Sequence, residues 1–254
     1  KGKATRYSLS AQAHLMMPLN IETYFNNEVD ERKVQESFNF KLIREVLPQV
    51  TLFTAEETAR LETAHNSFLA NMSTLSDLEY RKEMERLGVD LSWKSSQIEG
   101  NTYSLLETER LLKEKETAQG KTKEEAVMLL NHKDALDFII DCPDYLKELS
   151  VRRLEDIHSI LTKELGVGNG IRKRRVGITG TNYRPLDNEF QIREALEDTC
   201  QLINGKDNVF EKALLALVLL SYIQAFTDGN KRTARISSNA ILIAWGYCPI
   251  SFRT

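Results

Sequence analysis

The sequence predicts a mostly α-helical protein with one small β-hairpin. Across most of the 254 residues, apolar side chains recur three and four positions apart, which is the pattern of an amphipathic helix. Serine, threonine, glycine and proline residues bracket several of these stretches in the manner of helix caps and stops. One stretch, residues 166–186, instead combines alternation with glycines, which favours two short strands.

The helical pattern of the N-terminal third covers residues 21–91 and is interrupted by Pro48. Thr54, followed three residues later by Glu57, is a capping box, so a new helix should begin directly after Thr54. Gly88 is the expected break at the end of this region. We therefore interpret residues 21–91 as an N-terminal helical extension.

Residues 1–20 carry a weaker pattern. The stretch 1–9 is similar to the last strand of a winged-helix wing, but a basic, flexible terminus explains the same residues. The chain begins without Met and stops inside a segment that reads as extended. These features predict part of a longer protein, whose missing N-terminal region would supply any contact with DNA.

Six further helices are expected after residue 100. They cover residues 104–115, 123–140, 150–165, 189–203, 213–223 and 231–244. Pro143 ends the second of them and Ser150 caps the third.

Composition excludes several protein classes. A hydrophobic content of 41% and a charged content of 28% suit a soluble globular protein, and a net charge of −3 gives no general attraction to nucleic acid or membranes. We find no membrane-spanning run and no signal peptide, and three scattered cysteines fit a reducing, cytoplasmic location. The histidines show no metal-binding spacing and are interpreted as surface or core residues away from the site; they are His14, His65, His132 and His158.

The loop between the last two predicted helices, within residues 224–235, has the features of a phosphate site. Residues 228–230 are types that turn tightly, and the free N–H groups of the following helix would bind an anion. Arg232 and Arg235 share a helix face. Asp228, as the only carboxylate, would be a Mg²⁺ ligand. A plain helix joint, with Asp228 as cap and both arginines in solvent, is the alternative.

This loop resembles the signature of the Fic (fido) family, H-x-F-x-[DE]-G-N-[GK]-R-x-x-R. The matching residues are Phe226, Asp228, Gly229, Asn230, Lys231, Arg232 and Arg235. The first position departs, because Gln224 replaces the histidine that removes the proton from the target hydroxyl. A glutamine is neutral at every pH, so the general base is missing.

A second stretch, residues 93–101, resembles the inhibitory helix of Fic proteins, [ST]-x-x-x-E-[GN]. Ser95 and Glu99 lie four residues apart, hence on one helix face, and Gly100 follows. The resemblance implies that Glu99 pairs with Arg235 and removes a γ-phosphate ligand. A short helix with a capping glycine and an exposed glutamate is the alternative.

The resemblance implies a Fic-type helical bundle over residues 92–254, with a β-hairpin flap at 171–186 that docks a protein target by strand pairing. The implied reaction is AMP transfer from Mg·ATP to a protein hydroxyl. The resemblance implies that Asp228 binds Mg²⁺ and that Phe226 anchors the loop. The backbones of Gly229, Asn230 and Lys231, with the Asn230 side chain, would cradle the α- and β-phosphates. Arg232 would bind the β-phosphate and Arg235 the γ-phosphate.

Three functional hypotheses follow. The first is an adenylyltransferase that Glu99 inhibits and that Gln224 makes slow. The second is a non-catalytic, nucleotide-binding regulatory module. The third is a DNA-associated regulator that binds through a region outside this chain. Transfer of phosphate instead of AMP is an alternative reaction, because the lysine at position 231 resembles the signature of the phosphotransferring toxin branch of the family. A homodimer is a further hypothesis.

Overall fold

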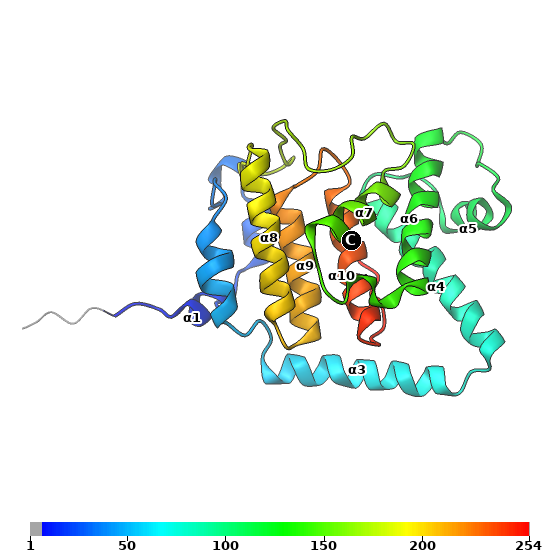
Figure 1. The fold of residues 1–254 in the computed structure, drawn as a ribbon, viewed down its shortest axis with the longest axis horizontal. Helices are drawn as coiled ribbons and strands as arrows, with labels where there is room; N and C mark the ends of the chain where they lie inside the picture. Colours follow the sequence, from blue (N-terminus) through cyan, green and yellow to red (C-terminus); the bar gives the residue numbers. More distant parts are fainter. Residues whose placement is uncertain (1–6, 254) are drawn as a thin grey trace, which may run out of the picture.

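The computed structural model describes residues 7–253 (Figure 1). Helices account for the ordered elements of this part of the chain. In order they are α1 (Ala11–Leu15), α2 (Ile21–Asn26), η1 (Val29–Glu31), η2 (Leu42–Val46), η3 (Leu47–Gln49), α3 (Ala55–Ser73), α4 (Asp77–Ile98), α5 (Leu105–Glu114), α6 (Lys123–Asp141), η4 (Pro143–Leu146), α7 (Val151–Leu161), α8 (Glu189–Gly205), α9 (Val209–Ile223) and α10 (Asn230–Ala244). The prediction of a wing strand at residues 1–9 lies largely outside the described residues.

Helix α10 is the centre of the fold. It packs against α9, α7, α6 and α4, and in Figure 1 it lies between α9 and α6. All of its residues except Lys231 and the last two are buried, including both arginines of the loop motif. Because α10 is buried on every side, the loop that precedes it is held on a rigid support.

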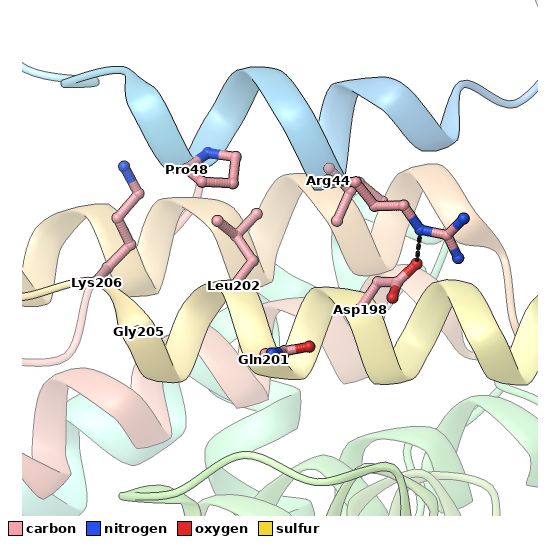
Figure 2. A pocket seen from close by; sticks show the side chains of 8 residues that line it. Arg44, Pro48, Asp198, Gln201, Leu202, Gly205 and Lys206 are labelled. Atoms are coloured by element: carbon pink, nitrogen blue, oxygen red, sulfur yellow. Dashed lines mark hydrogen bonds and ion pairs between the residues drawn. The ribbon is translucent and has the colours of Figure 1, made fainter.

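One attachment of the N-terminal extension to the bundle is made through α8. The π-helix η2 carries Arg44, which pairs with Asp198 at 2.6 Å (Figure 2) and also with Glu194 at 2.6 Å. Beneath this pair lies a groove of about 390 Å³ that Pro48 and Lys206 also line. The Lys206 ammonium donates to the Val50 carbonyl and pairs with a glutamate of α9, so the charges along this joint are already paired.

Helix α3 has the predicted start but little packing. Thr54 and Glu57 form the expected capping box. Yet none of the α3 residues is buried, and a cavity of about 380 Å³ lined mainly by apolar side chains lies between α3, α9, α10 and the C-terminal segment. In Figure 1, α3 runs along one edge of the molecule.

The predicted break at Gly88 is wrong. Helix α4 continues through Gly88 to Ile98, so the inhibitory segment is the end of a 22-residue helix rather than a short helix of its own. A Cβ at position 88 would lie 3.4 Å from Cε of Lys133 on α6, which is an ordinary contact, so neither space nor backbone conformation requires glycine here. A single glycine is tolerated inside a helix, and from Gly88 onward α4 has a buried face that packs against α6.

The predicted β-hairpin at residues 171–186 does not form. Within the part of the chain that the structure describes, the one β-bridge joins Arg184 to Ser37 in parallel, not to another residue of the flap. The segment instead wraps around the buried guanidinium of Arg172, which donates to the carbonyls of Arg174 and Leu186. These side chain–backbone bonds satisfy carbonyls that a hairpin would have paired. We keep the word flap for residues 171–186.

Among residues 7–253, no helix is both long and apolar enough to cross a membrane.

Candidate functional site

The loop between α9 and α10 is closed by two backbone positions with positive φ. Gln224 caps the end of α9 at φ 53°, and Gly229 caps the start of α10 at φ 75°. A Cβ on Gly229 would lie 3.0 Å from Cγ2 of Thr162 and 3.5 Å from Cδ2 of His158. Glycine is therefore required here for both conformation and space.

The Asn230 side chain closes the loop on itself. Its Oδ1 accepts from the N–H of Phe226 at 2.8 Å, and its Nδ2 donates to the carbonyl of Phe226 at 2.8 Å. These two bonds hold the Asn230 amide in the loop and leave one N–H of its Nδ2 for the phosphate contact that the sequence predicts.

His158 of α7 supports the same loop, contrary to the prediction that no histidine lies near it. Its ring stacks on Phe226 with the centroids 3.9 Å apart, and its Nε2 lies 2.9 Å from the carbonyl oxygen of Asp228. That contact requires a proton on Nε2. Burial lowers the pKa of His158, so the ring is neutral. The sequence signal for this contact was the position of His158, a polar ring on the apolar side of a predicted helix.

Gln224 does not present a free amide to the loop. Its side-chain Nε2 donates to the carbonyl of Ser221 at 2.7 Å, and the residue is only 8% exposed. Its own carbonyl accepts from Nε of Arg172 at 2.7 Å, while the Arg172 N–H donates to the Ala225 carbonyl at 3.0 Å. Arg172, which sequence analysis did not single out, thus joins the flap to the base position. Burial lowers its pKa.

The first turn of α10 has the features of an anion site. No side chain caps it, and among the described residues the N–H groups of residues 230–232 have no protein acceptor. Asp228 lies beside this turn with its side chain 65% exposed, and Arg232 donates to one of its oxygens at 3.3 Å. Arg232 itself is buried and also donates to the Leu161 carbonyl at 3.1 Å. Unpaired N–H groups and a buried cation together favour a bound phosphate.

Arg235 is held entirely by the end of α4. Its Nε donates to Oγ of Ser95 at 2.9 Å, and its Nη2 donates to the Ser95 carbonyl at 3.1 Å and to Oε1 of Glu99 at 2.7 Å. Arg235 is 8% exposed and Glu99 24% exposed, so this ion pair is partly shielded from water. The two sequence stretches singled out separately therefore meet in space.

The segment after Glu99 is fixed to the start of α6. Gly100 turns the chain at φ 90°, and the Asn101 side chain donates to the Glu125 carbonyl at 2.8 Å. The Glu125 carboxylate accepts from the N–H of Thr102 at 2.8 Å and from its hydroxyl at 2.6 Å. The hydroxyl and N–H groups of Thr102 and the N-cap Thr122 lower the pKa of Glu125 to about 2. Glu99 is thus positioned by a second, independent helix.

His132 of α6 lies behind Arg235. It is buried, its Nδ1 is 3.4 Å from Oγ of Ser92, and its Nε2 has no partner among the described residues. Burial, followed by the charges of Arg235 and Arg232, lowers its pKa to about 3. A neutral ring at this position adds no third positive charge to the arginine pair.

The described residues contain no group of three or more histidine, cysteine or acidic side chains that could hold a metal. Asp228 is a single carboxylate beside the anion site. Mg²⁺ in nucleotide sites is commonly bound by one or two carboxylates together with the substrate phosphates, so Asp228 fits that kind of ion.

Comparison with known proteins finds a match that includes the loop between α9 and α10. Residues 148–242 match the model of the Fic/DOC family. Over 160 residues the chain is 29% identical to protein adenylyltransferase fic-1 of Caenorhabditis elegans, a match that covers 60% of this chain and 31% of that protein. It is 30% identical over 169 residues to protein adenylyltransferase Fic of Nematostella vectensis, covering 63% of this chain and 39% of that protein. The match therefore spans between 31% and 39% of the length of these relatives.

Solved structures agree on the fold. A fragment of Fic-1 from C. elegans superposes with a TM-score of 0.61 at 23% identity, covering 78% of this chain and 62% of that one. A Fic domain-containing signaling protein from Bacteroides thetaiotaomicron superposes with a TM-score of 0.65 at 20% identity, covering 75% of each chain. The helical bundle around α10 thus has the fold of these Fic proteins, and residues 148–242 within it match the Fic/DOC family model.

Proposed function

We propose that this chain is a Fic-type adenylyltransferase that transfers AMP from Mg·ATP to a protein hydroxyl, that Glu99 inhibits, and that Gln224 slows. The observation that carries the proposal is the bond from Arg235 to Glu99 at 2.7 Å, which joins the two recognised motifs. The relatives named protein adenylyltransferase support the reaction.

In this proposal the phosphates of ATP lie over the first turn of α10. The backbone N–H groups of residues 230–232 and the Arg232 guanidinium bind them, and Asp228 holds Mg²⁺. The ion, when bound, neutralises charge on the phosphates and on the leaving pyrophosphate. The target hydroxyl oxygen bonds to the α-phosphorus, the bond to the β-phosphate bridging oxygen breaks, and the hydroxyl proton must pass to a base.

Inhibition follows from the contacts of Arg235. Its three hydrogen bonds among the described residues go to Ser95 and Glu99, and the Glu99 carboxylate neutralises its charge and would repel a γ-phosphate beside it unless Glu99 withdraws. A nucleotide that binds while the pair is closed would place its phosphates differently from one that binds Arg235. Removal of the Glu99 carboxylate should therefore increase productive binding.

Gln224 limits the removal of the proton from the target hydroxyl. Its amide cannot accept a proton, and the amide nitrogen is already bonded to the Ser221 carbonyl. General base catalysis contributes about 10²–10⁴-fold. The Gln224→His variant should therefore raise the rate by about that factor, and the unmodified site should be slow.

A second candidate function is a nucleotide-binding regulatory module without catalysis. The observation that favours it is the same engaged Gln224 amide, which leaves the anion site complete and the base position inert. ATP occupancy would then change the Glu99–Arg235 pair and, through α4, a surface recognised by a partner.

Transfer of label from ATP separates these candidates. Glu99→Gly and Glu99→Gly with Gln224→His would be incubated with cell lysate and with ATP labelled at either the α- or the γ-phosphate. Label from α-labelled ATP with Gln224 in place supports the adenylyltransferase. The same label only after Gln224→His supports the regulatory module. Label from γ-labelled ATP alone would indicate phosphate transfer. No ATP binding by either variant in calorimetry would overturn both candidates.

A further inference from the structure

The cavity beneath α3 is bounded by four parts of the chain. Helix α3 covers one side with Leu61 and Phe68, helices α9 and α10 form the opposite side, and the segment after α10 contributes Ile250 and Phe252. Its volume of about 380 Å³ lies within the range of small-molecule sites in proteins. We call this space the α3 cavity. Because its walls come from several directions, it is a cavity of the fold and differs from a single apolar face on the surface.

The two main walls of the α3 cavity are incompletely covered by protein. Leu61 and Phe68 are half-buried, and no residue of α3 is buried. On α9, Leu214 and Leu217 line the cavity and are half-buried, whereas their neighbour Leu215 is buried in the core. An apolar molecule between these walls would therefore remove apolar surface of both α3 and α9 from water.

The walls offer few polar groups. The Tyr247 hydroxyl donates to the Glu62 carboxylate and the Cys248 thiol donates to a backbone carbonyl, each at 3.3 Å, so both groups are already bonded. The imidazole of His65 and the hydroxyl of Ser238 are the other polar side-chain groups of the lining. Nδ1 of His65 is buried without a hydrogen-bond partner among the described residues. The cavity can therefore satisfy few hydrogen bonds of a bound molecule.

These walls disfavour three kinds of occupant. An extended peptide would bury an N–H and a carbonyl group at nearly every residue, and the walls have too few partners for them. A charged molecule would leave its charge unpaired, since no acidic residue, lysine or arginine lines the cavity in the part of the chain that the structure describes. A helix pairs its own backbone groups, but its diameter of about 10–12 Å would force α3 away from α9.

We propose that the α3 cavity binds a small, uncharged aliphatic molecule with a single polar group, in the class of the medium-chain alcohols, and that the bound molecule holds α3 against α9 and α10. The hydrocarbon part contacts both walls, and the polar group lies toward His65 or Ser238. Binding requires neither nucleotide nor a change in the Glu99–Arg235 pair. The proposal is therefore independent of the proposed function.

The test titrates the whole chain, without nucleotide, with 1-octanol in a calorimeter. Binding should saturate, and the affinity should fall about fourfold for each methylene removed in the series from 1-octanol to 1-butanol. Leu217→Trp should fill the cavity from the α9 side and lower the affinity for 1-octanol about tenfold or more. Val218→Trp is the matched control, because Val218 is the next residue of α9 and is 51% exposed, and it should bind as the unmodified chain does.

A second pair of variants tests the cavity from the α3 side, should Leu217→Trp not fold. Ala64→Phe places a ring in the cavity and should cause the same loss of affinity. Ala59→Phe changes an exposed alanine of the same helix that lies outside the lining, and it should leave the affinity unchanged. Protection of the α10 amides from hydrogen exchange shows that each variant is folded.

Hydrogen exchange also reports the effect of the bound molecule on α3. Saturating 1-octanol should slow the exchange of α3 amides about tenfold and leave the α10 amides unchanged. Absence of saturable binding, or equal affinities of each filled variant and its control, would overturn the proposal. Faster exchange of α3 on binding would also overturn it, because the helix would then be displaced, as a helix of a protein partner requires. A failure of AMP transfer would bear on the proposed function alone.

Discussion

The two arginines of the motif have different partners although they share one helix face. Arg232 is bonded to the Leu161 carbonyl and to Asp228, both next to the loop. Arg235 is bonded only to Ser95 and Glu99, which lie about 140 residues earlier in the chain. A nucleotide can therefore meet Arg232 without a rearrangement of the fold, whereas the charge of Arg235 is neutralised by Glu99 until the end of α4 releases it.

Gly229 should tolerate no side chain. Gly229→Ala places a Cβ at φ 75°, 3.0 Å from Thr162, and we expect it to lower the free energy of unfolding by about 1–3 kcal/mol. Urea denaturation measures this. Gly177→Ala is the control, since a Cβ there meets nothing within 4 Å and φ is not positive. A Gly229→Ala variant as stable as the control would show that the loop relaxes without strain.

His132 should make the protein less stable in acid. Its pKa is about 3 in the fold and 6.5 in the unfolded chain, so the unfolded chain binds more protons between these values. The free energy of unfolding should therefore fall as the pH drops below 6.5, with a contribution of about 2 kcal/mol by pH 5 and none above pH 7. Denaturation at pH 7 and pH 5 should show a smaller loss for His132→Gln.

His14→Gln is the control for that measurement, because His14 is exposed near the start of the chain. It should keep the acid sensitivity of the unmodified protein. The same pH dependence in His132→Gln and the unmodified chain would mean that the buried ring is not the responsible group.

At the scale of elements, α4 is fixed to the fold at its end rather than at its start. Its last turn binds Arg235 of α10, and the turn after it is bound by Glu125 of α6. The first half of α4 and the whole of α3 lack such contacts, since no residue of α3 is buried. Movement of the inhibitory segment is therefore more easily coupled to α6 and α10 than to the N-terminal extension.

Helix α3 should open at low free energy. It has no buried residue and lies over a cavity of about 380 Å³, so little apolar surface opposes its separation from α9 and α10. Native-state hydrogen exchange should show α3 amides exchanging much faster than those of α10. The buried α9 serves as internal reference. Protection in α3 equal to that in α10 would show that the helix is held by contacts other than burial.

For the whole molecule, Mg·ATP should stabilise the fold to a degree that depends on Glu99. A ligand that binds only the folded state adds about 2.7 kcal/mol at a concentration of 100 Kd. Since Glu99 occupies Arg235, the rise in Tm with Mg·ATP should be small for the unmodified chain and larger for Glu99→Gly. Thermal denaturation of both chains with and without Mg·ATP measures this rise in Tm.

Arg235→Met in the Glu99→Gly background is the control for the thermal experiment. It removes the released arginine, so the additional rise in Tm should disappear. An equal rise in the unmodified chain and in Glu99→Gly would mean that the ion pair does not restrict nucleotide binding.

The sequence predicted the helical class, most helix boundaries and the two motifs, because caps, periodicity and loop residues act locally. Thr54 with Glu57 gave the start of α3, and Pro143 follows the end of α6 as expected. It was wrong at Gly88 and at the flap. Both errors have a tertiary origin, since the packing of α4 against α6 carries the helix through Gly88 and the buried guanidinium of Arg172 takes carbonyls of the flap.

The sequence by itself determined that residues 224–235 contain a glycine-bearing loop followed by the start of a helix and that the base position holds Gln224, because these features depend on residue type and spacing alone. Only the tertiary structure decided that Arg235 is paired with Glu99, that His158 supports Phe226, and that residues 36–40 lie on the flap. The physical reason is distance along the chain: such contacts depend on which helices pack together, and no local pattern records that.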